Sequence, residues 1–252
     1  MNYKITDKQL LDYIMCPIYY NLRYTNKFKI QQPESYNTLI NQVVNSFLSK
    51  LLDGEIMNTY DIKRKWDMIS KKNPDIITPD KNLKGISALL SFYRWAQTYE
   101  LIPVDIAMPY NMVLKDDNIN INSNPPDSIE LSGHINSLIL TKNNQNIEEL
   151  IVDFSSRAPD QTKLDMDLKI SLNHVAFYLT YKKQLIGTRI YHVKTNKVYY
   201  TVRDPLSESN KIKKIALNIA KSIDNNLWYP HQSPLCPMCK AKDFCRMWGL
   251  EL

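Results

Sequence analysis

The segment Cys236-Pro-Met-Cys239-Lys-Ala-Lys-Asp-Phe-Cys245 places three of the four cysteines of this 252-residue chain close together near its C-terminal end. The fourth cysteine, Cys16, stands near the N-terminal end. The first residues contain no apolar signal segment, so we expect an intracellular, cytoplasmic protein in which disulfides do not form. Three thiolates at this spacing can converge on one centre, because a C-x2-C turn places two sulfur atoms on the same side. The sequence therefore predicts a metal centre that ties the two ends of the chain together.

The kind of centre follows from the type and the spacing of its ligands. A set made only of thiolates is typical of zinc or of an iron–sulfur cluster. Structural zinc sites usually combine two pairs of ligands, whereas one ligand here stands at the opposite end of the chain. The spacing therefore favours a cluster on Cys16, Cys236, Cys239 and Cys245. In the alternative, Cys16 is a buried helical cysteine, and the C-terminal segment binds zinc with the help of His231.

The composition excludes several classes of protein. Hydrophobic residues make up 44% of the chain and charged residues 23%, as in a globular protein, so extensive disorder is not expected. The five glycines stand alone, which excludes the glycine-rich phosphate-binding loops of dinucleotide-binding and P-loop proteins. No apolar run approaches the length of a membrane-spanning helix, which is about 18 residues. The formal charge of +6 permits binding to nucleic acid but does not by itself indicate it.

The first hundred residues show helical periodicity. Thr6-x-x-Gln9 has the form of a capping box, and the helix that it opens is expected to continue to Tyr20. Apolar residues at helical spacing predict three more helices, at residues 35–52, 60–72 and 84–100.

Residues 101–225 alternate between strand and helix patterns, separated by short polar stretches. The expected strands are 104–114, 129–140, 148–154, 188–194 and 197–203, and the expected helices are 162–183 and 206–225. This order describes an α/β core with helical additions at both ends. We expect one structural unit over residues 1–252, with a helical part at 1–100, the core at 101–225 and a cysteine-rich segment at 226–252 that closes onto Cys16.

Two motifs around the cysteines make the chain similar to a known family. The first is Tyr13-Ile-Met-Cys16-Pro-Ile-Tyr-Tyr20, and the second runs from Trp228 through Cys236 to Cys245. Together they resemble the RecB-like branch of the PD-(D/E)XK nuclease superfamily, which includes CRISPR-associated iron–sulfur exonucleases and AddB-type nuclease domains. The resemblance implies an α/β fold with a restriction-endonuclease-like mixed sheet flanked by helices, an N-terminal helical region and a C-terminal metal-cluster segment. It also implies a 4Fe–4S cluster on the four cysteines, with zinc as the alternative.

The catalytic positions of that family are mostly changed in this chain. Such nucleases hold Mg²⁺ or Mn²⁺ on clustered carboxylates and position water with a lysine. The family's helix histidine aligns with Asn41, and the carboxylate of its G-x-x-D strand aligns with Asn136. Its D-x-K strand aligns with Asp153 and Ser155, so the aspartate is kept and the lysine is lost. The resemblance thus implies a degenerate active site with Asp153 as its remnant. In the alternative, Asp153 caps a turn.

Three functions fit this pattern. The first is a catalytically inactive nuclease-fold protein that binds DNA or serves as a subunit of a DNA-processing, replication or transcription complex, for example of a phage or mobile element. Arg157, Lys163 and Lys169 are the expected contacts to DNA. The second is an active Mg²⁺- or Mn²⁺-dependent DNA exonuclease or endonuclease with a displaced site, in which Lys163 or Lys169 supplies the missing lysine. The third is a purely structural or protein-interaction module. None of the three involves a membrane.

Overall fold

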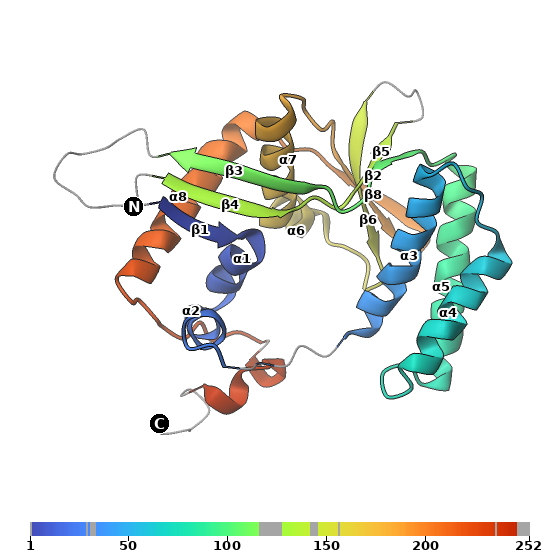
Figure 1. Ribbon diagram of the computed structural model, residues 1–252, viewed down its shortest axis with the longest axis horizontal. Helices are drawn as coiled ribbons and strands as arrows, with labels where there is room; N and C mark the ends of the chain where they lie inside the picture. The colour runs from blue at the N-terminus through green and yellow to red at the C-terminus, as the bar shows by residue number, and fades with distance from the viewer. Residues whose placement is uncertain are drawn as a thin grey trace. The chain divides into compact units, whose positions relative to one another are not determined.

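The computed structural model of the chain describes residues 2–28, 30, 34–115, 128–141, 146–155, 157–234 and 236–245 (Figure 1). Residue contacts divide the chain into two compact units. The terminal unit consists of Met1–Pro33, Tyr110–Gly133 and Pro205–Leu252, and the central unit consists of Glu34–Pro109 and His134–Asp204. Both units combine helices with a sheet, which confirms the α/β class. Residues 246–252 of the expected cysteine-rich segment lie outside the described residues.

The terminal unit contains a three-stranded sheet in the order β1-β4-β3. Strand β1 runs parallel to β4, with Asn2 opposite Ser128 and Thr6 opposite Ser132. The elements of this unit are β1 (Asn2–Thr6), α1 (Asp7–Met15), α2 (Pro17–Tyr20), the π-helix η1 (Asn21–Thr25), β3 (Pro109–Lys115), β4 (Ser128–His134), α8 (Pro205–Asp224) and the 3-10 turns η2 (Cys236–Met238) and η3 (Lys242–Phe244).

The central unit contains a five-stranded mixed sheet in the order β2-β5-β6-β7-β8. Only β6 and β7 are parallel among these neighbours, and helices α6 and α7 form the crossover between them. The elements of this unit are α3 (Tyr36–Leu52), α4 (Thr59–Lys72), α5 (Pro79–Thr98), β2 (Pro103–Asp105), β5 (Ser137–Leu140), β6 (Ile147–Asp153), α6 (Gln161–Asp165), α7 (Leu168–Tyr181), β7 (Thr188–His192) and β8 (Lys197–Thr201).

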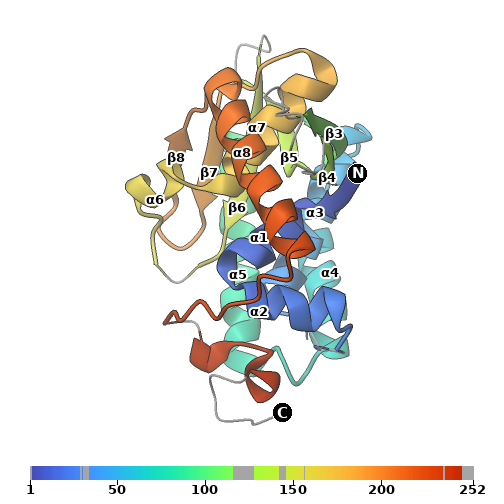
Figure 2. The ribbon, with the colours of Figure 1, turned by 90° about the vertical axis from the view of Figure 1, so that its left-hand side faces the viewer.

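Helix α6 covers the edge strand β8 (Figure 2). The Gln161 side chain donates to the carbonyl of Tyr200 at 3.0 Å, and the Thr201 hydroxyl donates to Asp165 at 2.8 Å. The first of these bonds occupies a backbone carbonyl at a sheet edge that would otherwise be available for pairing with another chain.

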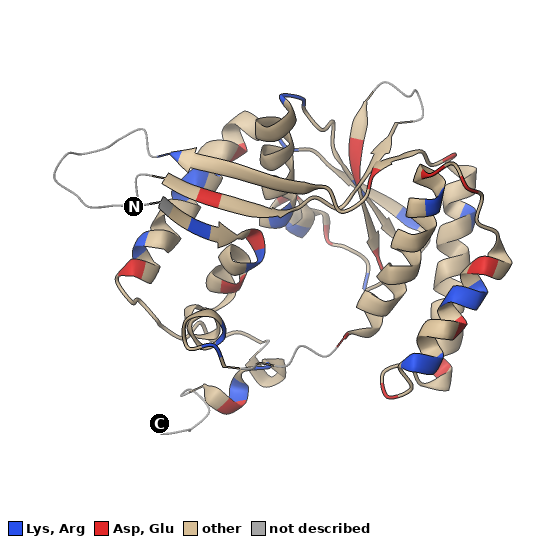
Figure 3. Cartoon of the chain, viewed as in Figure 1, with Lys and Arg blue, Asp and Glu red and all other residues tan. Residues whose placement is uncertain are grey.

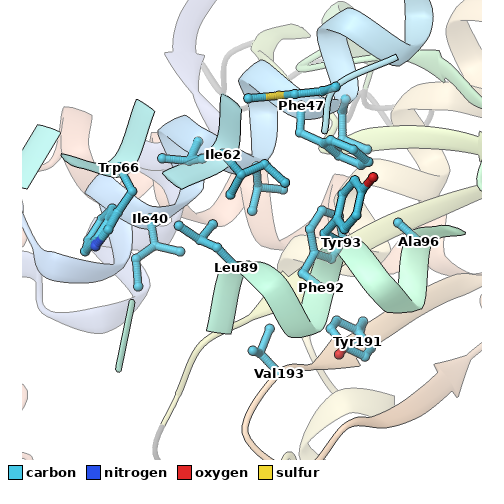
Figure 4. Close-up of a cluster of buried hydrophobic side chains, with 14 of the residues drawn as sticks. Ile40, Phe47, Ile62, Trp66, Leu89, Phe92, Tyr93, Ala96, Tyr191 and Val193 are labelled. Carbon is cyan, nitrogen blue, oxygen red and sulfur yellow. The ribbon is translucent and has the colours of Figure 1, made fainter. Parts of the chain in front are cut away.

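One face of the central sheet packs on helices α3, α4 and α5 to form the main hydrophobic core (Figure 4). Phe47, Phe92 and Tyr93 meet there in edge-to-face ring contacts, with centroids 5.6–5.7 Å apart. Tyr191 and Val193 bring the sheet into the same cluster. This core fixes the position of α3, which carries Asn41, against the strands.

Two segments that were each predicted as one strand form two separate strands. Residues 104–114 contain β2 and β3, and residues 129–140 contain β4 and β5, so each prediction joins strands from two different sheets. The first break contains Ala107, whose φ is 55°. The second contains Ile135, whose N–H donates to the carbonyl of Met108 at 2.8 Å. Apolar residues occur on both sides of each break, so periodicity alone does not reveal it.

The capping box is confirmed, but the helix it opens is shorter than predicted. Gln9 N–H donates to Thr6 Oγ1 at 3.1 Å, and Thr6 N–H donates to Gln9 Oε1 at 2.8 Å. The helix ends before Cys16, and Pro17 begins a new one. A proline in a helix interior removes one hydrogen bond and clashes with the preceding turn, whereas it is favoured in a first turn.

Three further boundaries differ from the prediction. Residues 162–183 form two helices, because the Asp167 side chain accepts hydrogen bonds from the N–H groups of Lys169 and Ile170 and so caps a new helix. Helix α5 begins at Pro79 rather than at residue 84. Strand β1 was not predicted. The remaining helices and strands agree with the prediction to within a few residues.

Within the described ranges, no helix has the length and apolar character needed to cross a membrane.

Gly85→Ala is expected to destabilise the central unit, although alanine is the better helix former. A Cβ at Gly85 would overlap the ring of Trp66, which is completely buried. We expect the free energy of unfolding in urea, followed by tryptophan fluorescence, to fall by about 1–3 kcal/mol. Ser87→Ala, at an exposed position of the same helix, is the matched control and should not lower it. Equal stability of Gly85→Ala and the wild-type protein would contradict this packing.

Candidate functional site

Cys16 lies in a break between two helices of the terminal unit. Its backbone is extended (φ −166°, ψ 113°). Its N–H donates to the carbonyl of Asp12 at 3.0 Å, and its carbonyl accepts from the N–H of Tyr20 at 3.1 Å. The backbone of Cys16 is therefore held by both flanking helices.

A polar cluster links the segments before and after Cys16. Asp12 Oδ2 accepts hydrogen bonds from Arg23 Nη1 at 3.1 Å and from the Tyr24 hydroxyl at 2.7 Å. Arg23 Nη1 also donates to the Tyr19 hydroxyl at 3.1 Å. Burial and the hydrogen bond to Asp12 raise the pKa of Tyr24. These contacts connect α1 to η1 and so limit the movement of the turn that carries Cys16.

The other three cysteines lie in or beside two 3-10 turns: Cys236 begins η2, Cys239 follows it, and Cys245 follows η3. The N–H of Cys239 donates to the carbonyl of Cys236 at 3.0 Å, and the N–H of Cys245 donates to that of Lys242 at 3.0 Å. The N–H of Ser233 also lies 3.3 Å from Cys236 Sγ. Backbone hydrogen bonds therefore hold the turns beside Cys239 and Cys245.

All four cysteines line one pocket of about 570 Å³ within the terminal unit. Burial raises the pKa of the Cys239 thiol, and the Cys16, Cys245 and Cys236 thiols raise it further. The shared pocket lining therefore places the four predicted ligands in one part of the terminal unit. All four are free thiols. Among the described residues, which include these cysteines, no three His, Cys, Asp or Glu side chains are arranged to hold a metal ion.

Four free thiols are the donor type of a thiolate-ligated centre, but their arrangement is not that of a closed metal site. Ile18, Tyr19, Leu22 and Ala241 pack beside Cys16 and Cys239 and give the pocket an apolar wall, which shields such a centre from solvent. His231 also lines the pocket, so the alternative zinc ligand is present as well.

A second pocket, of about 200 Å³, lies in the central unit, and we call it the asparagine pocket. Its polar lining comes from Asn41 and Asn45 of α3 and from His134, Asn136 and Ser137 next to β5. Residues 150–152 of β6 contribute the apolar side. Two of the four positions taken from the nuclease alignment, Asn41 and Asn136, are therefore brought together here.

The other two positions, Asp153 and Ser155, lie outside the lining of this pocket. Asp153 Oδ1 accepts from the N–H of Ser155 at 2.8 Å, and Asp153 Oδ2 lies 3.0 Å from the Ser155 hydroxyl. This is the geometry of an Asx turn. The carboxylate thus caps the turn after β6, as the alternative interpretation of Asp153 expects. Buried His192 lies 3.1 Å from the Ser155 carbonyl and supports the same turn.

The sequence did not indicate a buried carboxylate beneath Asn136. Glu149 is completely buried, with 0% of its surface exposed. Its Oε1 accepts from the amides of Asn136, at 2.8 Å, and Asn173, and its Oε2 accepts from the Thr188 hydroxyl at 2.9 Å. Burial raises the pKa of Glu149, although these three hydrogen bonds and the charge of Lys169 oppose the rise.

One sequence signal could have drawn attention to this carboxylate. Glu148 and Glu149 are adjacent in an otherwise apolar strand, and alternation places them on opposite faces of the sheet. Both are buried, and Glu148 is paired with Arg189, with Arg189 Nε 2.7 Å from Glu148 Oε2. Two adjacent carboxylates in a strand that is buried on both faces therefore require specific partners on each face.

The three predicted DNA contacts lie in different settings. Arg157 and Lys163 are exposed and lie outside the lining of the asparagine pocket. Lys169 Nζ donates to the carbonyl of His134 at 2.8 Å, next to that pocket. Elsewhere, Lys and Arg are interspersed with Asp and Glu, as along α4 (Figure 3). Charge alone therefore does not mark one face as a binding surface.

No family model and no curated protein matches this chain. A solved structure described as "Crystal structure of SSO0001" is similar to it over 84% of this chain and 95% of the other, with 11% sequence identity and a TM-score of 0.40. No conclusion follows from a similarity of this size.

Glu149→Gln is expected to flatten the dependence of stability on pH. Because the folded-state pKa of Glu149 is raised, the wild-type protein should lose stability as pH rises from the unfolded value of about 4.3 through the folded value. Glutamine keeps an acceptor for the Asn136 and Asn173 amides but does not titrate. Urea unfolding at a series of pH values should therefore show a smaller decline for the variant.

Glu149→Leu is the contrasting variant, because it leaves the three donors without an acceptor. It should lower the free energy of unfolding by about 1–3 kcal/mol for each unsatisfied group. If the wild-type protein and Glu149→Gln lose stability in parallel as pH rises, the folded-state pKa of Glu149 is not raised.

Proposed function

We propose that this chain is a RecB-like, nuclease-fold protein without metal-ion catalysis, which binds DNA or acts as a subunit of a DNA-processing, replication or transcription complex. The order of elements in the central unit supports the fold assignment. In the central unit, helices α3, α4 and α5 precede strands β2, β5 and β6, and helices α6 and α7 then lead to strands β7 and β8 of the same mixed sheet. This is the helix-and-strand order that the cysteine motifs imply by resemblance.

The observation that carries the proposal is the lining of the asparagine pocket. Asn41 stands at the position of the family's histidine and Asn136 at the position of its strand carboxylate, and the described lining residues include no Asp or Glu. Amide oxygens can coordinate Mg²⁺ but bring no negative charge to it, and a two-metal phosphoryl transfer depends on that charge. The remnant Asp153 is engaged by Ser155.

The proposed 4Fe–4S cluster on Cys16, Cys236, Cys239 and Cys245 supplies a structural cross-link rather than a reaction. It would join the turn between α1 and α2 to the C-terminal segment in which Cys236, Cys239 and Cys245 adjoin the two 3-10 turns. Zinc held by the C-terminal cysteines and His231 is the alternative occupant.

The proposed DNA contact is to the phosphate backbone. The formal charge is +6, and Arg157 and Lys163 are exposed side chains that can reach phosphates. Binding through such residues is independent of the base sequence. It weakens as the salt concentration rises, because the release of counterions from the phosphates then contributes less free energy.

A second candidate function is an active Mg²⁺- or Mn²⁺-dependent deoxyribonuclease with a displaced site. The placement of Lys169 favours it, because its ammonium lies at the His134 carbonyl beside the asparagine pocket, and its charge acts on Glu149. In that case Lys169 would replace the lysine that Ser155 does not provide.

A cleavage assay separates the two candidates. Labelled single- and double-stranded DNA, incubated with Mg²⁺ or Mn²⁺, should remain intact with the wild-type protein and with Asp153→Ala. Binding to the same DNA should weaken steeply between low and high salt. Metal-dependent cleavage that Asp153→Ala or Lys169→Ala abolishes would establish the displaced-site nuclease instead. Affinity that does not change with salt would contradict backbone binding.

Cys16→Ser should remove the proposed cluster. After anaerobic purification, the wild-type protein should absorb at about 400 nm and contain iron, whereas the variant should lose both and melt at a lower temperature. Met238→Ser is the matched control, because Met238 stands between two of the cysteines and is 74% exposed. A colourless wild-type protein that contains zinc would identify the alternative centre. Unchanged colour and melting of Cys16→Ser would show that Cys16 is not a ligand.

A further inference from the structure

The asparagine pocket contains amide side chains whose hydrogen-bonding groups have no partner among the described residues, and the proposed absence of catalysis does not explain them. The side chains of Asn41 and Asn45 make no hydrogen bond to any other residue in the described part of the chain. Asn41 is partly exposed, and Asn45 and Asn136 are exposed. Each amide carries both donors and an acceptor. The pocket therefore offers unused hydrogen-bonding groups to a ligand that enters from solvent.

The charges of the lining indicate which ligands are favoured. Among the described residues that line the pocket there is no Asp or Glu to hold a cation and no Lys or Arg to hold a phosphate. A neutral ligand with both donors and acceptors matches amide side chains best. Asparagine can pair with a base edge through two hydrogen bonds at once, as it does with adenine.

The size and the apolar side of the pocket further restrict the kinds of ligand that fit it. About 200 Å³ is less than the about 300–1,000 Å³ of sites for drug-sized molecules, so the pocket admits one ring system rather than a whole nucleotide. Val44, Ile135 and residues 150–152 of β6 provide apolar contacts for the face of a ring. Proteins that take single bases out of the stack combine such faces with hydrogen bonds to the base edge.

One of the three amides is already held in a fixed orientation. Asn136 Nδ2 donates to Glu149 Oε1 at 2.8 Å, which leaves the Asn136 carbonyl oxygen and one N–H for a ligand. Because Glu149 is completely buried and also bonded by Asn173 and Thr188, it cannot turn out to capture a metal ion without losing these partners.

We propose that the asparagine pocket binds one unpaired nucleobase of a DNA strand. The inference rests on the proposed DNA-binding function and adds a base contact to the backbone contacts. The phosphates next to that base would remain outside the pocket, where Lys169 lies beside the His134 carbonyl.

The experiment compares two short single-stranded oligonucleotides of equal length and charge, one with bases and one made of abasic nucleotides. At low salt the wild-type protein should bind the first at least about fivefold more tightly, which corresponds to the net effect of about one hydrogen bond to the base. Asn41→Leu, which keeps the approximate shape but removes the amide, should abolish this preference. Gln42→Leu, an adjacent exposed position outside the pocket, is the matched control. Asn45→Ala, at an exposed position, serves if Asn41→Leu does not fold.

The outcomes separate this inference from the function on which it rests. Equal affinity for the two oligonucleotides would overturn the base contact and leave backbone binding intact. No binding of either oligonucleotide would overturn both. A preference that survives in folded Asn41→Leu and Asn45→Ala would place the base contact elsewhere. Saturable Mn²⁺ binding, detected by electron paramagnetic resonance and lost in Asn41→Leu, would make the pocket a cation site and overturn the inference.

Discussion

The buried carboxylate of Glu149 sets the arrangement of the central unit, because a charge or a neutral acid without partners would be costly at that depth. Its three donors come from three different segments. Asn136 precedes β5, Asn173 lies in the middle of α7, and Thr188 begins β7. The strand that carries Glu149 therefore cannot shift its register without breaking bonds to all three.

The same constraint explains why an amide stands at position 136. An aspartate there, as in the nuclease motif, would place a second carboxylate within hydrogen-bonding distance of Glu149. Two carboxylates at such a short distance require a shared proton or a bound cation. The amide removes that requirement and donates a hydrogen bond instead.

The sequence predicted those features whose causes lie within a few residues. The Thr6–Gln9 capping box is such a case, since both of its hydrogen bonds join positions three residues apart. The ends of β2 and β5 could not be predicted in this way, because Ile135 finds its partner, Met108, far away in the chain. The four cysteines were an exception, because the sequence predicted that they lie near one another although Cys16 is far from the other three along the chain. Clustered cysteines have few roles, so their spacing carried information about a shared site.

Glu149 was missed for a related reason. Periodicity reports which face of a strand is buried, but it does not report whether a polar residue on that face has partners. Asn173 and His174 stand in a helix that is buried on nearly all sides, and only the fold shows that Asn173 faces Glu149 while His174 Nε2 lies 2.9 Å from Thr188 Oγ1. Every hydrogen-bond partner of this network belongs to the central unit, whereas the four cysteines belong to the terminal unit. The hydrogen bonds that hold Glu149 and Asn136 beside the asparagine pocket therefore lie within one unit and do not include the four cysteines.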